Sequence, residues 1–281
     1  SLSRQRYYRI LANLHAAGAN PAIERVVPVT RLMESKKTYS AREQHWNRLL
    51  AAHETVPGSL PLQTVTLDSK NPRKLSWLLP AGQSLPEQYR KIDSYLRASF
   101  MLPKNLTVVQ KSTGIPRNLF LPISGQIVLS TEFFESARPK LSPADLQSLQ
   151  EFSLLQEFAL ALISDCDLPF TGDLEDAAAE LTAVLVASDP QLQRLAPAVL
   201  RWYKVLAQEH KNVLDLKYWS ATALDEQRYF QLLGYLYTQD PKLAPSAAAE
   251  IPGKRLNKLS FEYPQKKRNW SRLLAPFRPG K

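Results

Sequence analysis

The stretch that decides the fold is Leu155-Gln156-Glu157-Phe158-Ala159-Leu160-Ala161-Leu162-Ile163. It lies in a helix that the sequence predicts over residues 142–164, with Ser142 suited to cap the N-terminus. Apolar residues surround this helix from 152 to 163, and the polar exceptions are Ser153, Gln156 and Glu157. A helix that is apolar on nearly every side is buried. We therefore expect it to form the centre of the fold.

The periodicity of the rest of the chain predicts a small sheet before this helix and more helices after it. Expected strands span residues 62–67, 75–79, 106–109 and 126–129, and expected helices span residues 3–19, 40–54, 86–100, 174–188, 191–208, 225–238 and, near the end, 265–274. The last two strands are separated by a loop that holds Gly114, Pro116 and Pro122, which predicts a wide hairpin. The fold class is α+β and mainly helical.

Composition sets further limits. With 44% hydrophobic and 22% charged residues, the chain of 281 residues is typical of a globular protein with a substantial core. It contains no apolar run of about 18 residues, so no transmembrane segment is expected. The single cysteine, Cys166, excludes an internal disulfide, and an inert thiol is the expected role for it. The four histidines are never four residues apart, so no local pair predicts a metal clamp.

The net charge of +10 is concentrated at the C-terminal end, where residues 253–281 hold nine basic residues and one acid. Trp270 lies within the most basic part, among Lys266, Lys267, Arg268 and Arg272. Interleaved basic and aromatic residues fit a surface that binds a polyanion, either nucleic acid or an anionic membrane. The alternative is that the charges form a solvated face and that Trp270 docks the tail on the core.

Several short motifs follow the central helix in order. They are Gly172-Asp173-Leu174-Glu175-Asp176-Ala177-Ala178-Ala179, Leu224-Asp225-Glu226-Gln227-Arg228, and a tail segment with Trp270. As a set, these motifs and the central helix resemble a family of exported bacterial zinc metallopeptidases of zincin type. The resemblance covers residues 86–278 and implies a zincin-like domain there, with a basic tail from 253. Residues 1–85 would then form a helical N-terminal extension with the first strands.

In that family the central helix carries the pattern HExxH, in which two histidines one turn apart bind zinc and the glutamate activates a metal-bound water. The resemblance places the two histidines at Gln156 and Leu160 of this chain and the glutamate at Glu157. It places the third ligand at Glu175 and the last acid of the following motif at Ala179. Leucine has no donor atom and a glutamine amide is a poor zinc ligand, so we expect no zinc cofactor.

The resemblance also indicates cysteines in the family at the positions of Thr113, Ser130, Gly234 and Leu259. None of these residues is a cysteine in this chain. The chain has therefore lost the disulfides that such cysteines would form, together with its two histidine ligands.

These losses predict a catalytically inactive, metallopeptidase-like protein that acts as a binding or scaffolding module for another protein or a peptide. No catalytic residue is expected, and Glu157 is the relict of the base, buried and satisfied by a partner such as Arg228. The alternative is a hydrolase with a site built on the carboxylates of Glu157, Glu175 and Asp176. The family resemblance places the protein in the periplasm or outside the cell. The sequence does not indicate an oligomeric state.

Overall fold

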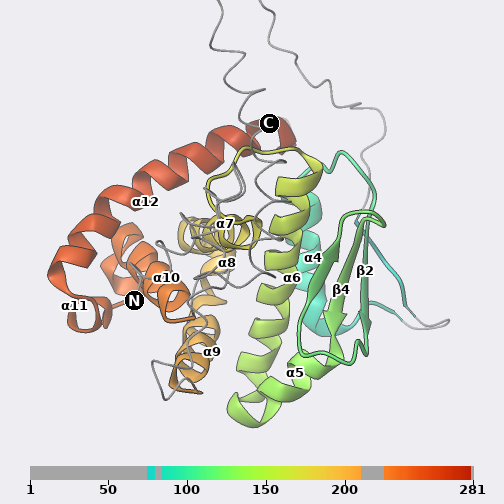
Figure 1. The fold of residues 1–281 in the computed structure, drawn as a ribbon, viewed down its shortest axis with the longest axis horizontal. Coiled ribbons are helices and arrows are strands. Elements are labelled where there is room, and N and C mark those ends of the chain that lie inside the picture. The colour runs from blue at the N-terminus through green and yellow to red at the C-terminus, as the bar shows by residue number, and fades with distance from the viewer. Residues whose placement is uncertain (1–74, 80–83, 210–224, 280–281) are drawn as a thin grey trace, which may run out of the picture. The chain divides into compact units, whose positions relative to one another are not determined.

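Helix α6, Pro143–Asp165, is the central element of the fold, as the sequence predicts. The computed structural model describes residues 75–79, 84–209 and 225–279, all of which belong to the structural unit Asp68–His210 with Leu224–Lys281. Within it, α6 contacts the sheet on one side and helices α7, Leu174–Ser188, and α9, Ala196–Glu209, on the other (Figure 1). Ser142 caps α6 by accepting a hydrogen bond from the backbone N–H of Asp145. The expected mainly helical α+β class is confirmed.

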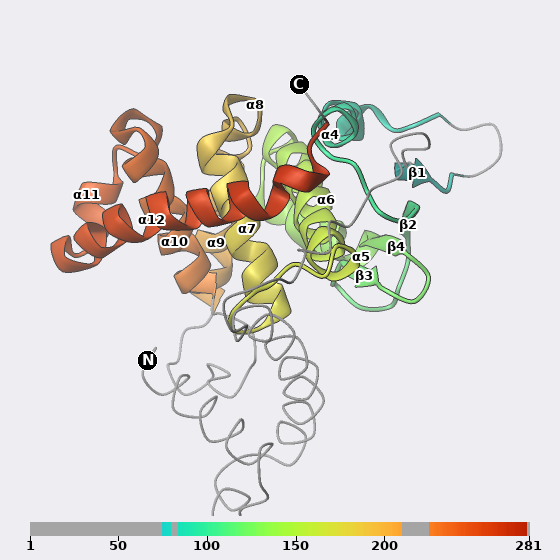
Figure 2. The ribbon, with the colours of Figure 1, turned by 90° about the horizontal axis from the view of Figure 1, so that it is seen from above.

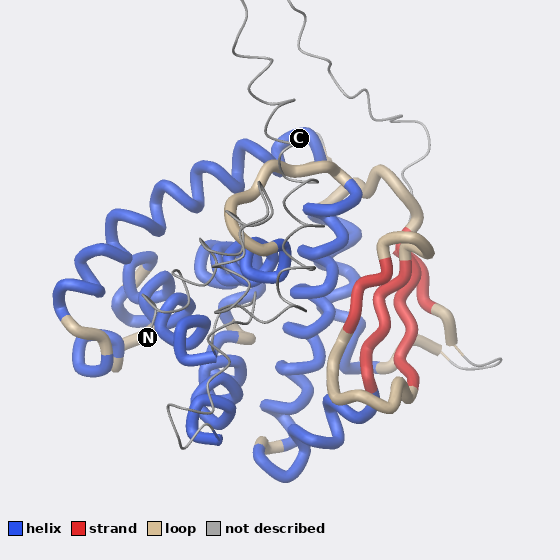
Figure 3. Tube along the Cα trace, in the orientation of Figure 1, coloured by secondary structure: helices blue, strands red, loops and turns tan. Residues whose placement is uncertain are grey.

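Among the described residues the sheet has four strands in the order β1-β2-β4-β3. Their bounds are Leu75–Trp77 for β1, Leu106–Lys111 for β2, Leu119–Leu121 for β3 and Gln126–Ser130 for β4. Strands β1, β2 and β4 run parallel, whereas β3 is antiparallel to β4 and forms an edge of the described sheet. Figure 3 shows the strands gathered on one side of the domain and most of the helices on the other.

The predicted wide hairpin between 106–109 and 126–129 is wrong. Both strands exist, but they are parallel neighbours, and the hairpin partner of β4 is the short strand β3. Ile127, Val128 and Leu129 are buried in succession, as is usual for a central strand of a parallel sheet. The turn from β3 to β4 ends at Gly125, whose positive φ and close approach to the Asn105 carbonyl leave no room for a side chain.

The remaining helices surround α6. Helix α4, Glu87–Ser99, lies beside it, and α7 begins and ends where the sequence predicts. The helix predicted over 191–208 is divided into α8, Pro190–Gln193, and α9, with Pro197 in the first turn of the second helix. The other described elements are α5, Thr131–Ala137; η1, Arg138–Lys140; α10, Asp225–Gln239; η3, Pro241–Leu243; α11, Ala247–Glu250; and η4, Ala275–Phe277.

The C-terminal helix α12, Gly253–Leu274, is more than twice as long as the helix predicted near 265–274. It continues through Pro264, which is the reason that the sequence pattern underestimated its length. Leu259, Tyr263 and Trp270 are buried on one face of α12, where the helix contacts α7 and α10. This burial outweighs the cost of one proline in the helix.

Two groups of predictions remain. The helices expected over 3–19 and 40–54 and the strand expected over 62–67 lie outside the described residues. Of the helices that are described, none combines the length and the apolar composition that crossing a membrane requires.

Candidate functional site

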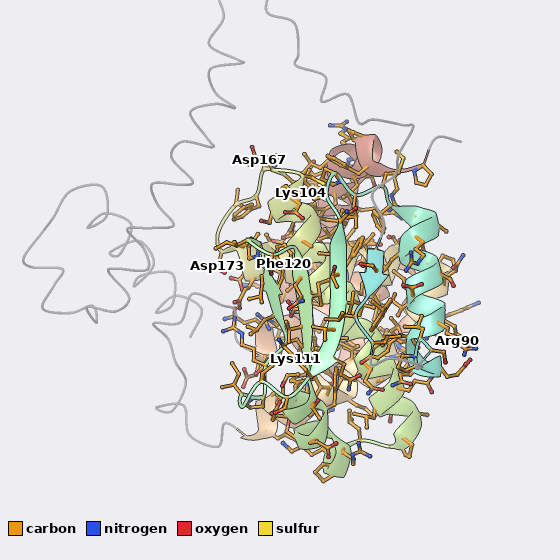
Figure 4. The ribbon with its side chains drawn as sticks, turned by 90° about the vertical axis from the view of Figure 1, so that its right-hand side faces the viewer. Arg90, Lys104, Lys111, Phe120, Asp167 and Asp173 are labelled. Carbon is orange, nitrogen blue, oxygen red and sulfur yellow. The ribbon has the colours of Figure 1, made fainter. Side chains whose placement is uncertain are left out.

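Six of the residues singled out by the sequence line one cavity of about 360 Å³. Its lining includes Gln156, Glu157 and Leu160 from α6, Glu175 from the first turn of α7, and Asp225 and Arg228 from α10. Strand β3 and the loops on both sides of it add Pro116, Arg117, Asn118, Leu119, Phe120 and Pro122 to the lining. Figure 4 labels Phe120, which belongs to β3. Asp173, which precedes α7, lies on the same side of the sheet in that view. The structure thus brings together positions that are far apart in the sequence.

The start of α7 is fixed locally. Asp173 caps this helix by accepting a hydrogen bond from the backbone N–H of Glu175, and Gly172 before it adopts a positive φ of 86°. The cap leaves the Glu175 side chain in the first turn, where it faces the cavity. The neighbouring Asp176 is not among the cavity-lining residues, and neither are Glu226 and Gln227 of the motif before Arg228.

Glu157 is the most perturbed carboxyl group at the cavity. Its side chain is buried, with 7% of its surface exposed. Burial raises the pKa of Glu157 to about 7, and the negative charge of Glu175 adds to this shift. The positive charges of Arg117 and Arg228 and a hydrogen bond from the backbone N–H of Phe120 act in the opposite direction. The Oε2 atom of Glu157 has no hydrogen-bond partner among the described residues. The carboxyl group is therefore only partly satisfied.

This burial makes stability depend on pH. The pKa of Glu157 rises from the ordinary 4.5 to about 7, so between these values the folded state binds more protons than the unfolded chain. The contribution of Glu157 to the free energy of unfolding therefore falls as the pH rises through this window. We expect Glu157→Gln to gain stability relative to the natural protein, by on the order of 2 kcal/mol, between pH 5 and pH 8.

Urea denaturation of both proteins at the two pH values measures this difference. The matched control is Glu135→Gln, which removes a half-exposed carboxylate that pairs with Arg138 outside the cavity. A difference between Glu157→Gln and the natural protein that stays constant with pH would contradict the assigned burial of the carboxyl group.

Arg117 is a charged residue of the cavity that the sequence did not reveal. It lies in the loop before β3, and its guanidinium forms an ion pair with the carboxylate of Glu175. The sequence instead suggested Arg228 as the partner of Glu157. Arg228 is close enough to lower the pKa of Glu157, but its Nε makes no hydrogen bond with any described residue. The guanidinium that pairs with Glu175, the position that the family resemblance assigns to the third ligand, is therefore that of Arg117.

Comparison with known proteins gives one match. The model of a protein family described as "putative metallopeptidase" matches residues 82–274. The chain belongs to this metallopeptidase family. No curated protein and no solved structure matches it. The matched segment contains every described residue that lines the cavity.

A metallopeptidase family implies zinc, but the residues at this cavity do not fit a zinc ion. Zinc in a catalytic site takes three protein ligands from histidine, cysteine or carboxylate side chains. Leu160 has no donor atom, Gln156 offers only an amide, and the Glu175 carboxylate is paired with Arg117. In the part of the chain that the structure describes, no three histidine, cysteine, aspartate or glutamate residues are grouped as a metal site would need.

The positions that the family resemblance indicates as cysteines lie together in two pairs. The hydroxyl of Thr113 donates to the hydroxyl of Ser130 over 3.1 Å. A Cβ atom at Gly234 would lie 3.4 Å from the Cβ of Leu259, where α10 meets α12. Each pair is close enough for two side chains to be joined, although neither is joined here.

The other residues singled out from the sequence lie away from the cavity. Cys166 caps the C-terminus of α6, and burial raises its pKa to about 12, which makes its thiol a poor nucleophile. On α12, Trp270 is buried and donates from Nε1 to Glu180 over 2.9 Å, while Lys266 pairs with the same carboxylate. Lys267 donates to Gln239. Two of the five predicted polyanion-binding residues, Arg268 and Arg272, are exposed.

Proposed function

We propose that this protein is a non-catalytic member of the metallopeptidase family that uses the former active-site cleft to bind a segment of another protein or a peptide. The observation that carries the proposal is the ion pair between Arg117 and Glu175. A guanidinium is permanently charged, and its planar set of N–H donors matches the geometry of a carboxylate. Arg117 thus supplies, at the former third-ligand position, the positive charge that a metal ion would otherwise bring.

The cleft keeps features that suit an extended peptide. Strand β3 lies at an edge of the described sheet and forms one wall of the cavity. Large apolar side chains are exposed on this strand and on both flanking loops: 48% of Ile115, 39% of Leu121 and all of Ile123 are exposed. An edge strand next to a pocket can add a partner strand through backbone hydrogen bonds while the pocket selects a side chain.

One observation favours a second candidate, a hydrolase with an unorthodox carboxylate site. A pKa near 7 allows a carboxyl group to accept and release protons at neutral pH, as a general acid or base must. Of the three carboxylates proposed for such a site, Glu157 and Glu175 line the cavity and Asp176 does not. Because Glu175 is paired with Arg117 and Asp176 does not line the cavity, the three carboxylates do not form a common site, which makes this the weaker candidate.

Zinc content and proteolysis separate these possibilities. We expect the purified protein, equilibrated with zinc and then dialysed, to hold well below one zinc ion per chain by mass spectrometry, and to leave fluorescent casein intact. Stoichiometric zinc whose removal abolishes casein cleavage would disprove the proposal. Cleavage that survives a chelator and is lost in Glu157→Gln would establish the carboxylate hydrolase instead.

Peptide binding is tested by selecting phage-displayed random peptides on the immobilised protein. We expect selected peptides to bind at least about tenfold more weakly to the double variant Leu121→Lys/Ile123→Lys, because lysines replace the apolar contacts beside the cavity. The matched control is Leu78→Lys, which changes another exposed leucine, beside the opposite edge strand, β1. A failure to select peptides, or equal weakening by the control, would rule out the β3 edge as the binding surface.

A further inference from the structure

The outward face of α12 presents a regular stripe of cationic residues. Lys254, Lys258, Arg268 and Arg272 are exposed, and with Phe261 they recur at intervals that place them along one side of the helix. The opposite side is the buried face that contacts α7 and α10. Figures 1 and 2 show α12 running along the outside of these helices. This surface, called the α12 stripe below, is separate from the cavity.

The charges of the α12 stripe are mostly not neutralised. Lys254, Arg268 and Arg272 form no ion pair with any described residue, and Lys258 shares Glu262 with Arg255. By contrast, the neighbouring Lys266 is held by Glu180 on the buried side of the helix. The basic residues of α12 thus divide into those that fix the helix on the core and those that face solvent. Only the second group is free to attract an anionic partner.

Phe261 identifies the kind of partner. It lies in the middle of the stripe, and 75% of its surface is exposed. No other phenylalanine, tyrosine or tryptophan among the described residues is exposed to this extent. A stripe that only met phosphate groups would need no apolar side chain at its centre. A helix lying in a membrane interface needs both, because the apolar residue enters the acyl region while cations meet the lipid headgroups.

We propose that the α12 stripe docks the protein on an anionic lipid surface, with Phe261 inserted between headgroups and Lys254, Lys258, Arg268 and Arg272 above the lipid phosphates. This inference does not depend on the function proposed for the cavity. The helix lies along the membrane plane in this arrangement, and its buried face stays on the protein core.

The test is cosedimentation of the full chain with phosphatidylcholine vesicles that contain or lack phosphatidylglycerol. We expect binding only to the anionic vesicles, and weaker binding as the salt concentration rises. Arg268→Gln/Arg272→Gln should weaken binding about 30-fold, and Phe261→Ser should weaken it several-fold at unchanged charge. The matched control is Arg90→Gln/Lys111→Gln, which removes two exposed cations from α4 and β2 on the side shown in Figure 4.

Each other outcome would overturn the proposal. Equal weakening by the control pair would show that net charge alone drives binding. Duplex DNA that binds as tightly as the vesicles, with Phe261→Ser changing neither affinity, would identify the stripe as a nucleic-acid surface instead. Absence of binding to anionic vesicles at low salt would remove the membrane from consideration. All the substituted residues are exposed, so unchanged thermal unfolding is expected for every variant and is measured alongside.

Discussion

The double variant Gln156→His/Leu160→His is expected to bind zinc far more tightly than the natural protein. The two positions are one turn apart on α6, and both line the cavity together with Glu175. Histidines there would place two imidazoles on the same face of the helix, opposite a carboxylate. We expect the apparent affinity for zinc to rise by roughly three orders of magnitude, measured by competition with a fluorescent chelator.

Arg117 determines how complete this gain is. While its guanidinium pairs with Glu175, a metal ion must compete for the third ligand. Adding Arg117→Gln to the double variant should therefore raise zinc affinity by a further factor of roughly two to five, because the Glu175 carboxylate is released from a partly exposed ion pair. The same substitution without the histidines should have little effect on zinc binding. This difference separates a specific role of Arg117 from a general effect of removing a cation.

The control is a pair of histidines at the same spacing without a cavity. Arg268→His/Arg272→His places them on the exposed face of α12, at positions that form no ion pair with a described carboxylate. That variant should bind zinc much more weakly than the α6 pair, since no carboxylate is positioned as a third ligand. If Gln156→His/Leu160→His/Arg117→Gln binds zinc no better than the α12 pair, the cavity is not the remnant of a metal centre.

The local patterns of the sequence were sufficient for the helices around this site. The run from Leu155 to Ile163 indicates a buried helix because apolar residues lie on nearly every side of that helix. This property depends on the segment alone. The serine cap before α6 and the proline after α7 were equally local signals. The positions that correspond to zinc ligands were assigned from the family resemblance, and the three of them, Gln156, Leu160 and Glu175, line one cavity with Glu157.

Features that depend on distant parts of the chain could not be obtained in this way. The direction in which β2 and β4 pair is set by where the chain between them runs, and the apolar run at Leu119 was too short to indicate a strand. The ion pair of Arg117 joins residues 58 positions apart, and no spacing rule connects them. Similarly, the sequence could not divide the basic residues of α12, because the division depends on Glu180 in α7.

The contact between α10 and α12 leads to the other large expected effect. A Cβ at Gly234 would lie 3.4 Å from the Cβ of Leu259, close to the separation found across disulfides. We expect Gly234→Cys/Leu259→Cys, in a Cys166→Ser background, to form this disulfide under mild oxidation. The bond would close a loop of about 25 residues and should stabilise the oxidised protein by about 3 kcal/mol relative to its reduced form.

The single variants make this prediction specific. Gly234→Cys alone should destabilise the protein by about 1–3 kcal/mol, because the new side chain meets Leu259, which is completely buried. Leu259→Cys removes apolar volume at the same contact and should also destabilise. Formation of the disulfide should therefore restore the stability that each single substitution removes.

Thiol labelling in denaturant counts the free cysteines, and urea unfolding with and without reductant measures the stability. Two results would contradict the prediction: free thiols that persist under oxidant, or an oxidised form that is no more stable than the reduced one. Either would show that α10 and α12 do not come into close contact at Gly234.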